Sequence, residues 1–282
     1  SSTRVLKIWH YCNLSEVCII NHQPLFIVVT SINENYYDAL APFYKLVYPN
    51  WDASVQRQAA SLESVIREYI GEKPKTILDV ACGIGTQSIG LAHLGYKVTS
   101  SDLSSAEVEQ ARKEASRHGV QIEFHVVDMR QVWEIYQKQF DVLIACDNSV
   151  PHLLSDDEIL LAFKQFYRCT KSGGGCMISV RDYAQLERKD KQFQMYPRLV
   201  HQTEVGQIIL FDVWNFDSDS YEMTTYIVDD TGKPEANTHI FRGGQYYCVE
   251  IPTLVRLFQE AGFREITTLR DRFFQPLLIA LK

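Results

Sequence analysis

The spacing of hydrophobic residues along the chain changes repeatedly between residues 76 and 180. Short apolar runs alternate with segments in which apolar residues recur at helical spacing. The apolar runs are residues 76–81, 97–102, 122–128, 140–146 and 176–180, and the helical segments are residues 86–95, 104–119 and 155–170. Strands that alternate with amphipathic helices predict a parallel sheet with helices on both faces.

Two of these helical segments begin with a capping box, in which a serine and a glutamate three residues later satisfy free backbone donors. The pairs are Ser104 with Glu107 and Ser155 with Glu158. Gly95 and Gly119 stand where left-handed helix ends are expected. These signals place the loops at the two ends of the sheet.

The pattern differs on both sides of this region. Residues 35–70 have helical spacing with a tyrosine-rich beginning, and Gly71 is predicted to end that helix. Residues 198–250 resemble antiparallel strands joined by polar turns, and we interpret them as a lid. A helix and two closing strands follow. The predicted division is an extension (1–30), a helical cap (31–72), a core (73–182), a lid insertion (183–249) and a closing part (250–282).

The first thirty residues have little helical or strand period, and their role is left open. The polar stretch Asn21 to Gln23 interrupts the apolar run at residues 19–29, and no small-residue cleavage site follows, which disfavours a secretory signal. No run approaches the ~20 apolar residues that a membrane span needs.

A formal charge of −7, with no basic stripe, argues against a nucleic acid or an anionic membrane as partner and favours a small molecule. Seven cysteines form no CxxC pair and lie mostly within apolar runs, which is typical of reduced thiols in a cytoplasmic protein. No metal site is predicted. The oligomeric state stays open, a homo-oligomer included.

The strongest candidate for chemistry is LDVACGIGTQSIGLA at residues 78–92, where an apolar strand runs into a glycine turn and a helix. Gly83 and Gly85 allow a tight turn and let a ligand approach the backbone at a helix N-terminus. A dinucleotide fingerprint would place a third glycine at position 88, which is Ser88 here. A pyrophosphate ligand is therefore disfavoured.

Acids end three successive predicted strands, at Asp79, Asp102 and Asp128. Asp102 is placed to accept both ribose hydroxyls of a nucleoside. Asp128 is placed to accept an adenine amine while Met129 packs against the ring. The carboxyl edge of an open parallel sheet is the usual ligand position. The alternative for each acid is a helix cap or a solvated loop position.

An adenosyl ligand that lacks phosphate and carries positive charge suits these acids, and S-adenosylmethionine is such a ligand. The segments LDVACGIGT, SSDLS, VVDM and FDVLIAC together resemble the class I S-adenosylmethionine-dependent methyltransferases. The resemblance covers residues 75–182 and 250–282. It implies an α/β fold, namely a Rossmann-like, doubly wound seven-stranded sheet with a terminal antiparallel hairpin, here joined by a small antiparallel β lid.

The segments NSVPHL at 148–153 and ISVRDY at 178–183 are similar to those of glycine N-methyltransferase and the glycine/sarcosine methyltransferases. That resemblance implies that Asn148 and Arg181 hold the acceptor, with Arg181 on its carboxylate, while His152 lies near the cofactor and Tyr37 closes over it. These four residues are the candidates for the catalytic site. The residues that it and the motifs above assign to the cofactor are Asp79, Ala81, Gly83, Gly85, Asp102, Leu103, Asp128, Met129, Cys146, Arg57 and Tyr48.

Three positions depart from that family. Asp147 stands in place of a glycine, Pro151 in place of an alanine and Asp182 in place of an asparagine. The carboxylate of Asp147 suits an amine acceptor, or it caps a helix. Simpler interpretations exist for Arg181 as a surface arginine, for His152 as a packing residue and for the early tyrosines as a core face.

The expected function is methyl transfer to the nitrogen of a small amino acid or amine, with water or His152 taking the proton. Two alternatives stay open. One is an O- or C-methyltransferase of a small metabolite, and the other is a nucleoside-binding protein without catalysis.

Overall fold

The computed structural model describes residues 17–20, 23–26, 32–188 and 192–282. The chain divides into two compact units, Ser1–Ser31 and Ile32–Lys282. In the first unit β1 (Val17–Ile20) and β2 (Gln23–Phe26) pair as an antiparallel hairpin. The weak period of this segment did not predict that hairpin. Within the described residues, no helix is both long and apolar enough to cross a bilayer.

The second unit is built on a seven-stranded sheet in the order β12-β13-β7-β6-β3-β4-β5. The pairs β7–β6, β6–β3, β3–β4 and β4–β5 are parallel, while β12–β13 and β13–β7 are antiparallel. The predicted fold class is thereby confirmed. The strands are β3 (Thr76–Asp79), β4 (Lys97–Asp102), β5 (Glu123–Val126), β6 (Phe140–Ala145), β7 (Thr170–Ser179), β12 (Arg264–Leu269) and β13 (Leu277–Leu281).

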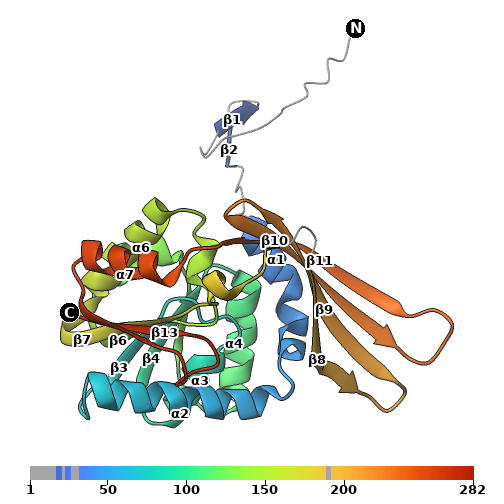
Figure 1. Cartoon of the computed structure of the whole chain (residues 1–282), viewed down its shortest axis with the longest axis horizontal. Coiled ribbons are helices and arrows are strands. Elements are labelled where there is room, and N and C mark those ends of the chain that lie inside the picture. Colours follow the sequence, from blue (N-terminus) through green and yellow to red (C-terminus); the bar gives the residue numbers. More distant parts are fainter. Residues whose placement is uncertain (1–16, 21–22, 27–31, 189–191) are drawn as a thin grey trace, which may run out of the picture. The chain divides into compact units, whose positions relative to one another are not determined.

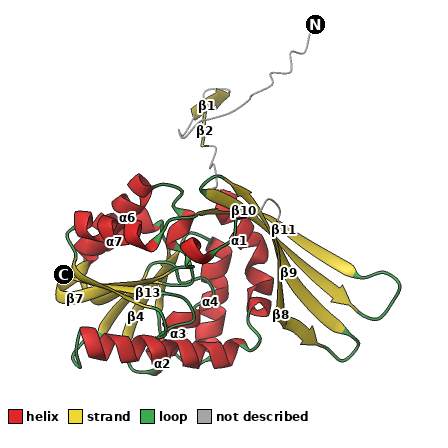
Figure 2. Ribbon diagram, in the orientation of Figure 1, coloured by secondary structure: helices red, strands yellow, loops and turns green. Residues whose placement is uncertain are grey.

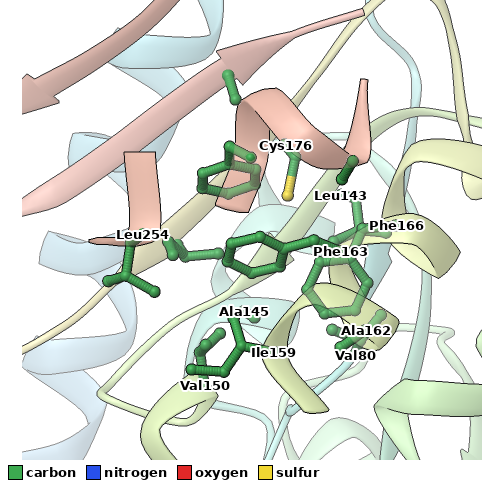
Figure 3. Close-up of a cluster of buried hydrophobic side chains, with 14 of the residues drawn as sticks. Val80, Leu143, Ala145, Val150, Ile159, Ala162, Phe163, Phe166, Cys176 and Leu254 are labelled. Atoms are coloured by element: carbon green, nitrogen blue, oxygen red, sulfur yellow. The ribbon is translucent and has the colours of Figure 1, made fainter. Parts of the chain in front are cut away.

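Helices cover both faces of this sheet (Figure 1). Alternate residues of β6 enter different cores, because side chains in a strand point to opposite faces. Leu143 and Ala145 pack with α6 (Asp156–Cys169) and α7 (Ile251–Ala261), and Figure 3 shows this core around Phe163 and Phe166. Val142 and Ile144 pack in the opposite core, which holds α2 (Trp51–Tyr69) and Leu91 of α3 (Thr86–His93). The remaining core helices are α4 (Ser105–Arg117) and the short α5 (Val132–Tyr136).

The helix predicted over residues 35–70 is interrupted. The structure has α1 (Ile32–Leu40), a 3₁₀ segment η1 (Ala41–Val47) and then α2. Pro42 stands at the first turn of η1, and Asn50 begins α2 by accepting the Ala53 N–H at 3.0 Å. Tyr48 lies in extended conformation between the two segments.

A separate four-stranded antiparallel sheet has the order β11-β10-β9-β8 and is drawn at one side of the core in Figure 2. Its strands are β8 (Gln192–Gln202), β9 (Gln207–Asp217), β10 (Ser220–Asp230) and β11 (Asn237–Tyr247). The sheet begins six residues before the predicted start at residue 198. Alternate residues of β9, among them Leu210 and Trp214, pack in one apolar cluster with Tyr36 and Leu40 of α1. We call β8 to β11 the lid sheet.

Candidate functional site

The loop from β3 to α3 forms the tight turn that the two glycines predict. Gly83 and Gly85 have φ angles of 51° and 90°, in the left-handed region that favours glycine. A β-carbon at Gly83 would also lie 2.9 Å from Oε2 of Glu107. The turn therefore requires glycine at position 83 for both its conformation and its close neighbour.

Asp79 is 1% exposed at the end of β3. Its Oδ2 accepts the Ser88 hydroxyl at 2.6 Å, and its Oδ1 accepts the Ala81 N–H at 3.3 Å. Ser88 also lies 2.8 Å from the Ser100 hydroxyl of β4. Burial raises the pKa of Asp79 to about 7. Ser88 stands where a dinucleotide fingerprint would have its third glycine, and its hydroxyl holds the Asp79 carboxyl in place.

Asp102 ends β4 and holds the glycine turn. Its Oδ2 accepts the Gly83 N–H at 2.9 Å, and its Oδ1 accepts the Ser104 N–H at 3.0 Å. Burial raises the pKa of Asp102. Each carboxylate oxygen has room for a second donor, so the group can still accept ribose hydroxyls. Leu103 follows it at the same edge of the sheet.

Asp128 has the capping role that was its alternative interpretation. Its Oδ1 accepts the Arg130 N–H at 2.8 Å and begins the 3₁₀ turn Met129–Gln131. The Arg130 guanidinium also bonds to the Asp128 carboxylate and bridges to Glu158 at 2.8 Å. Met129 packs against the core below α6. The adenine contact of Asp128 and Met129 stays a prediction, and Arg130 is a neighbour that the sequence pattern missed.

The loop after β6 contains two adjacent residues in left-handed conformation, Asp147 at φ 58° and Asn148 at φ 64°. Residues other than glycine adopt this conformation at a cost, and such strain gathers at functional sites. Both backbone N–H groups bond to Ser179 of β7, the first to its hydroxyl at 2.7 Å and the second to its carbonyl at 2.9 Å. β7 therefore holds this strained turn in place.

Asn148 is 1% exposed, and its side chain bonds inside the protein. Its Oδ1 accepts the Arg181 N–H at 2.9 Å, and its Nδ2 donates to the Tyr183 hydroxyl at 2.8 Å. These contacts join the loop after β6 to the segment after β7. The predicted contact of Asn148 with an acceptor stays a prediction.

Asp147 does not cap a helix. Its Oδ2 accepts the Tyr48 hydroxyl at 3.2 Å, and its Oδ1 lies 3.4 Å from Nε2 of Gln275. Burial raises the pKa of the carboxyl, against the opposing effect of the Arg181 charge. A carboxyl and a phenol thus meet where β6 ends, and the charge of Arg181 acts on this carboxyl. Cys146, just before it, is buried, and its carbonyl accepts the Ser149 hydroxyl.

His152 joins the core to the lid sheet. Its Nδ1 lies 2.7 Å from the Gln245 carbonyl, so this nitrogen donates, and in the neutral ring Nε2 accepts the Tyr37 hydroxyl at 2.9 Å. The Tyr37 hydroxyl also lies 2.8 Å from that of Tyr246. Burial lowers the pKa of His152 to about 4. So weak a base is poorly suited to take a proton from an ammonium group.

Arg181 is half-buried, so its interpretation as an exposed surface arginine is wrong. Its guanidinium carbon lies 5.1 Å from the ring centroid of Trp214 and 5.3 Å from that of Tyr246. Nη1 donates to the Tyr221 hydroxyl at 2.9 Å. The arginine that leaves β7 is therefore enclosed by aromatic residues of the lid sheet.

The early tyrosines take different places. Tyr37 and Tyr48 reach His152 and Asp147, respectively, whereas Tyr36 belongs to the lid core and bonds to Thr225. Arg57 is exposed and donates to Ser54 of its own helix at 2.9 Å, so its observed contact does not lead to the carboxyl edge.

Two further acids at this edge were missed. Asp38 of α1 accepts the Ser104 hydroxyl at 2.5 Å and the Ala106 N–H at 3.1 Å, which docks α1 on the start of α4. Glu107 is buried beside Gly83. The only sequence signal for Glu107 was its place in a capping box, and none marked Asp38.

These residues fit S-adenosylmethionine. The glycine turn exposes backbone beside Asp102, and the buried carboxyl of Asp79 and the half-buried carboxyl of Asp147 complement a sulfonium and an ammonium group. The observed acid set therefore agrees with an adenosyl cofactor of positive charge.

Comparisons with known proteins agree with this geometry. Residues 77–174 match a methyltransferase domain model. A putative methyltransferase of Geobacillus sp. (strain WCH70) is 28% identical over 241 residues, which are 83% of this chain and 92% of the relative. A glycine/sarcosine N-methyltransferase of Aphanothece halophytica is 31% identical over 134 residues, 48% of this chain and 49% of the relative.

Among solved structures, CalS10 of Micromonospora echinaspora, an amino pentose methyltransferase with bound S-adenosylmethionine, superposes with a TM-score of 0.69 at 17% identity. The superposition covers 85% of this chain and 94% of CalS10. The sheet order, the glycine turn beside Asp102 and the matched domain lead to one conclusion: the chain contains a methyltransferase domain, with S-adenosylmethionine as its cofactor.

Proposed function

We propose that this methyltransferase acts on the amine nitrogen of a small molecule, with glycine-like amino acids as the first candidates. The observation that carries the proposal is the half-buried carboxyl of Asp147 beside Tyr48, at the end of β6. Glycine/sarcosine N-methyltransferases have a small glycine at this position by the resemblance above. The Asp147 carboxyl therefore distinguishes this chain from those enzymes, and we expect its acceptor to interact with this carboxyl.

A primary or secondary amine is mostly protonated at neutral pH, but only the neutral amine has the lone pair that attacks a methyl group. A carboxylate binds the ammonium form and can then hold its proton. Burial raises the pKa of Asp147 above that of an ordinary aspartate, which makes it a stronger base. Asp147 also attracts the ammonium by its own charge, whereas both ring nitrogens of His152 are already engaged, with Gln245 and Tyr37.

Arg181 supports an acceptor that also carries a carboxylate. A guanidinium presents donors in a fork that matches a carboxylate, and here the fork is oriented by Tyr221 and by the rings of Trp214 and Tyr246. The Arg181 charge lowers the pKa of Asp147, which supports placing both side chains at the acceptor. An amino acid has opposite charges at its two ends, and it would complement this pair.

The bound cofactor supplies a methyl group on a sulfonium. The protein's part is then to position the amine, to hold its proton at Asp147 and to exclude water. The Tyr37 and His152 pair closes the lid sheet over the same edge by hydrogen bonds. A relative that shares 31% identity is by its name an N-methyltransferase of glycine and sarcosine, which are amine acceptors.

The test is formation of S-adenosylhomocysteine with glycine, sarcosine, dimethylglycine, an amino sugar and a phenol as acceptors. We expect turnover with at least one primary or secondary amine and none with dimethylglycine or the phenol. Turnover with the phenol alone would contradict the proposal and favour O-methylation. Tight binding of S-adenosylmethionine without any turnover would contradict it too and favour a protein without catalysis.

Asp147→Asn tests the carboxyl itself. The variant keeps the shape of the side chain and removes the base, so kcat/KM for the amine should fall about 100-fold or more, while affinity for S-adenosylmethionine changes little. Asp157→Asn is the matched control, because Asp157 is exposed at the start of α6. If Asp147→Asn retains full activity, Asp147 is not the proton acceptor.

A further inference from the structure

Glu107 is a buried acid that the fold does not explain. It lies in the first turn of α4 with 2% of its surface exposed. Among the described residues, its Oε1 has no hydrogen-bond partner. A buried polar atom without a partner is rare in native proteins and lowers stability.

The capping box does not account for Glu107. The Ser104 hydroxyl accepts the Glu107 N–H at 3.1 Å, which is one half of the box. In the other half the glutamate should accept the Ser104 N–H, but Asp102 accepts it instead, at 3.0 Å. The Glu107 carboxyl is therefore not needed to begin α4.

The direction of the side chain indicates what it serves. A β-carbon at Gly83 would lie 2.9 Å from Glu107 Oε2, and the Gly83 N–H donates to Asp102 at 2.9 Å. Glu107 and Asp102 thus flank the same glycine of the cofactor turn. Asp102 is the residue whose place at the end of β4 suits a ribose.

We propose that Glu107 is a cofactor-contacting residue that binds the ribose of S-adenosylmethionine together with Asp102. A protonated carboxyl and a ribose hydroxyl can each donate and accept, so the two groups match. Burial, followed by the charges of Asp102, Asp147 and Asp38, raises the pKa of Glu107 well above its ordinary value, which favours the protonated form. The cofactor would give Oε1 the partner that it lacks in the fold.

Two features separate this role from an effect of charge on the sulfonium. The ribose is common to S-adenosylmethionine and S-adenosylhomocysteine, whereas only the first has the sulfonium charge. A ribose contact therefore predicts equal losses for both ligands. The proposal depends on the cofactor alone, so its failure leaves the amine acceptor proposal untouched.

The experiment measures calorimetric affinity for both ligands and the melting temperature of the ligand-free protein. Glu107→Met keeps the side-chain volume and removes both oxygens. We expect both ligands to bind about tenfold more weakly, by equal factors, which corresponds to the loss of one hydrogen bond. The ligand-free variant should melt at a higher temperature, because an unpartnered polar atom has left the interior.

Glu107→Gln keeps a donor and an acceptor and should bind both ligands within about threefold of the wild type. Glu109→Met is the matched control, since Glu109 is exposed on the same helix and pairs with Lys113. With S-adenosylhomocysteine analogues that lack the 2′- or the 3′-hydroxyl, the effect of Glu107→Met should vanish for one of them. Unchanged affinity in Glu107→Met, or a loss for S-adenosylmethionine alone, would overturn the proposal.

Discussion

The side chains of Asn148 and Tyr183 bond to each other through both amide atoms, with Nδ2 2.8 Å and Oδ1 3.1 Å from the tyrosine hydroxyl oxygen. Oδ1 also accepts the Arg181 N–H. The pair therefore fixes the strained turn after β6 to the segment after β7. This connection thus lies between Asp147 and Arg181, the two residues that we place on the acceptor.

Asn148→Ala should lower the free energy of unfolding by about 2–4 kcal/mol. The variant leaves buried donors without partners and places alanine in left-handed conformation, which costs about 1 kcal/mol more than glycine does. Asn148→Gly is the control, because it loses the same bonds without that strain. Urea denaturation measures both, and equal losses would show that the turn relaxes.

Arg181→Ala should raise the acceptor KM about ten- to hundredfold, because a bond from a charged donor is lost. Affinity for S-adenosylmethionine should be nearly unchanged. Tyr221→Phe removes the hydroxyl that accepts from Arg181 and keeps the ring, so it should have a smaller effect. Equal losses of acceptor and cofactor affinity, measured by kinetics and calorimetry, would contradict an acceptor role for Arg181.

Asp79 should make the fold less stable as pH rises from about 4 to about 7. In this window the unfolded chain releases the proton, while the folded chain keeps it because burial raises the pKa to about 7. The difference from the ordinary value of 3.8 corresponds to at most about 4 kcal/mol. Other buried acids add to the slope, so Asp79→Asn should reduce it in urea denaturation curves by the contribution of Asp79. The exposed Asp271→Asn should keep it, and an unchanged slope in Asp79→Asn would refute the assignment.

His152 should act in the opposite direction. Its folded pKa of about 4 lies below the ordinary 6.5, so the unfolded chain takes up a proton first as pH falls from about 6.5 to about 4. Stability is lost across that window, by at most about 3 kcal/mol. His152→Gln should abolish this loss in denaturation measurements, whereas the exposed His125→Gln should not. A His152→Gln variant as acid-sensitive as the wild type would contradict a buried neutral histidine.

Gly90 should be essential where α2 and α3 pack together. A β-carbon there would lie 2.5 Å from the Ala59 β-carbon and 2.5 Å from the Val55 carbonyl oxygen. Gly90→Ala should lower the free energy of unfolding by about 1–3 kcal/mol through overpacking. Adding Ala59→Gly should recover part of that loss in thermal denaturation, because it removes one of the two clashes. No recovery would mean that the carbonyl contact dominates.

Much of the core could be predicted because its signals are local. The alternation of strand and helix, the glycines at 83 and 85 and the serine caps act within a few residues, so β3, α3 and α4 follow from the printed sequence. The expected ends of β4 and β6 are also right, which brought Asp102 and Asp147 to one edge of the sheet. Parallel strands put their carboxyl ends together whatever the loops contain.

Contacts between distant residues were decided only when the layers assembled. Arg181 is enclosed by lid-sheet rings 33 and 65 residues further along the chain, at Trp214 and Tyr246. Glu158 of α6 pairs with Arg130 beside Asp128, and α1 brought Asp38 onto α4. Burial gave Asp79, Glu107 and His152 their altered pKa values, since desolvation depends on the whole surroundings of a group. The sequence by itself thus determined the sheet, its turns and the edge where the acids gather, because these signals are local. The tertiary structure decided which of these acids are buried and which aromatic rings surround Arg181, because both depend on residues far away in the chain.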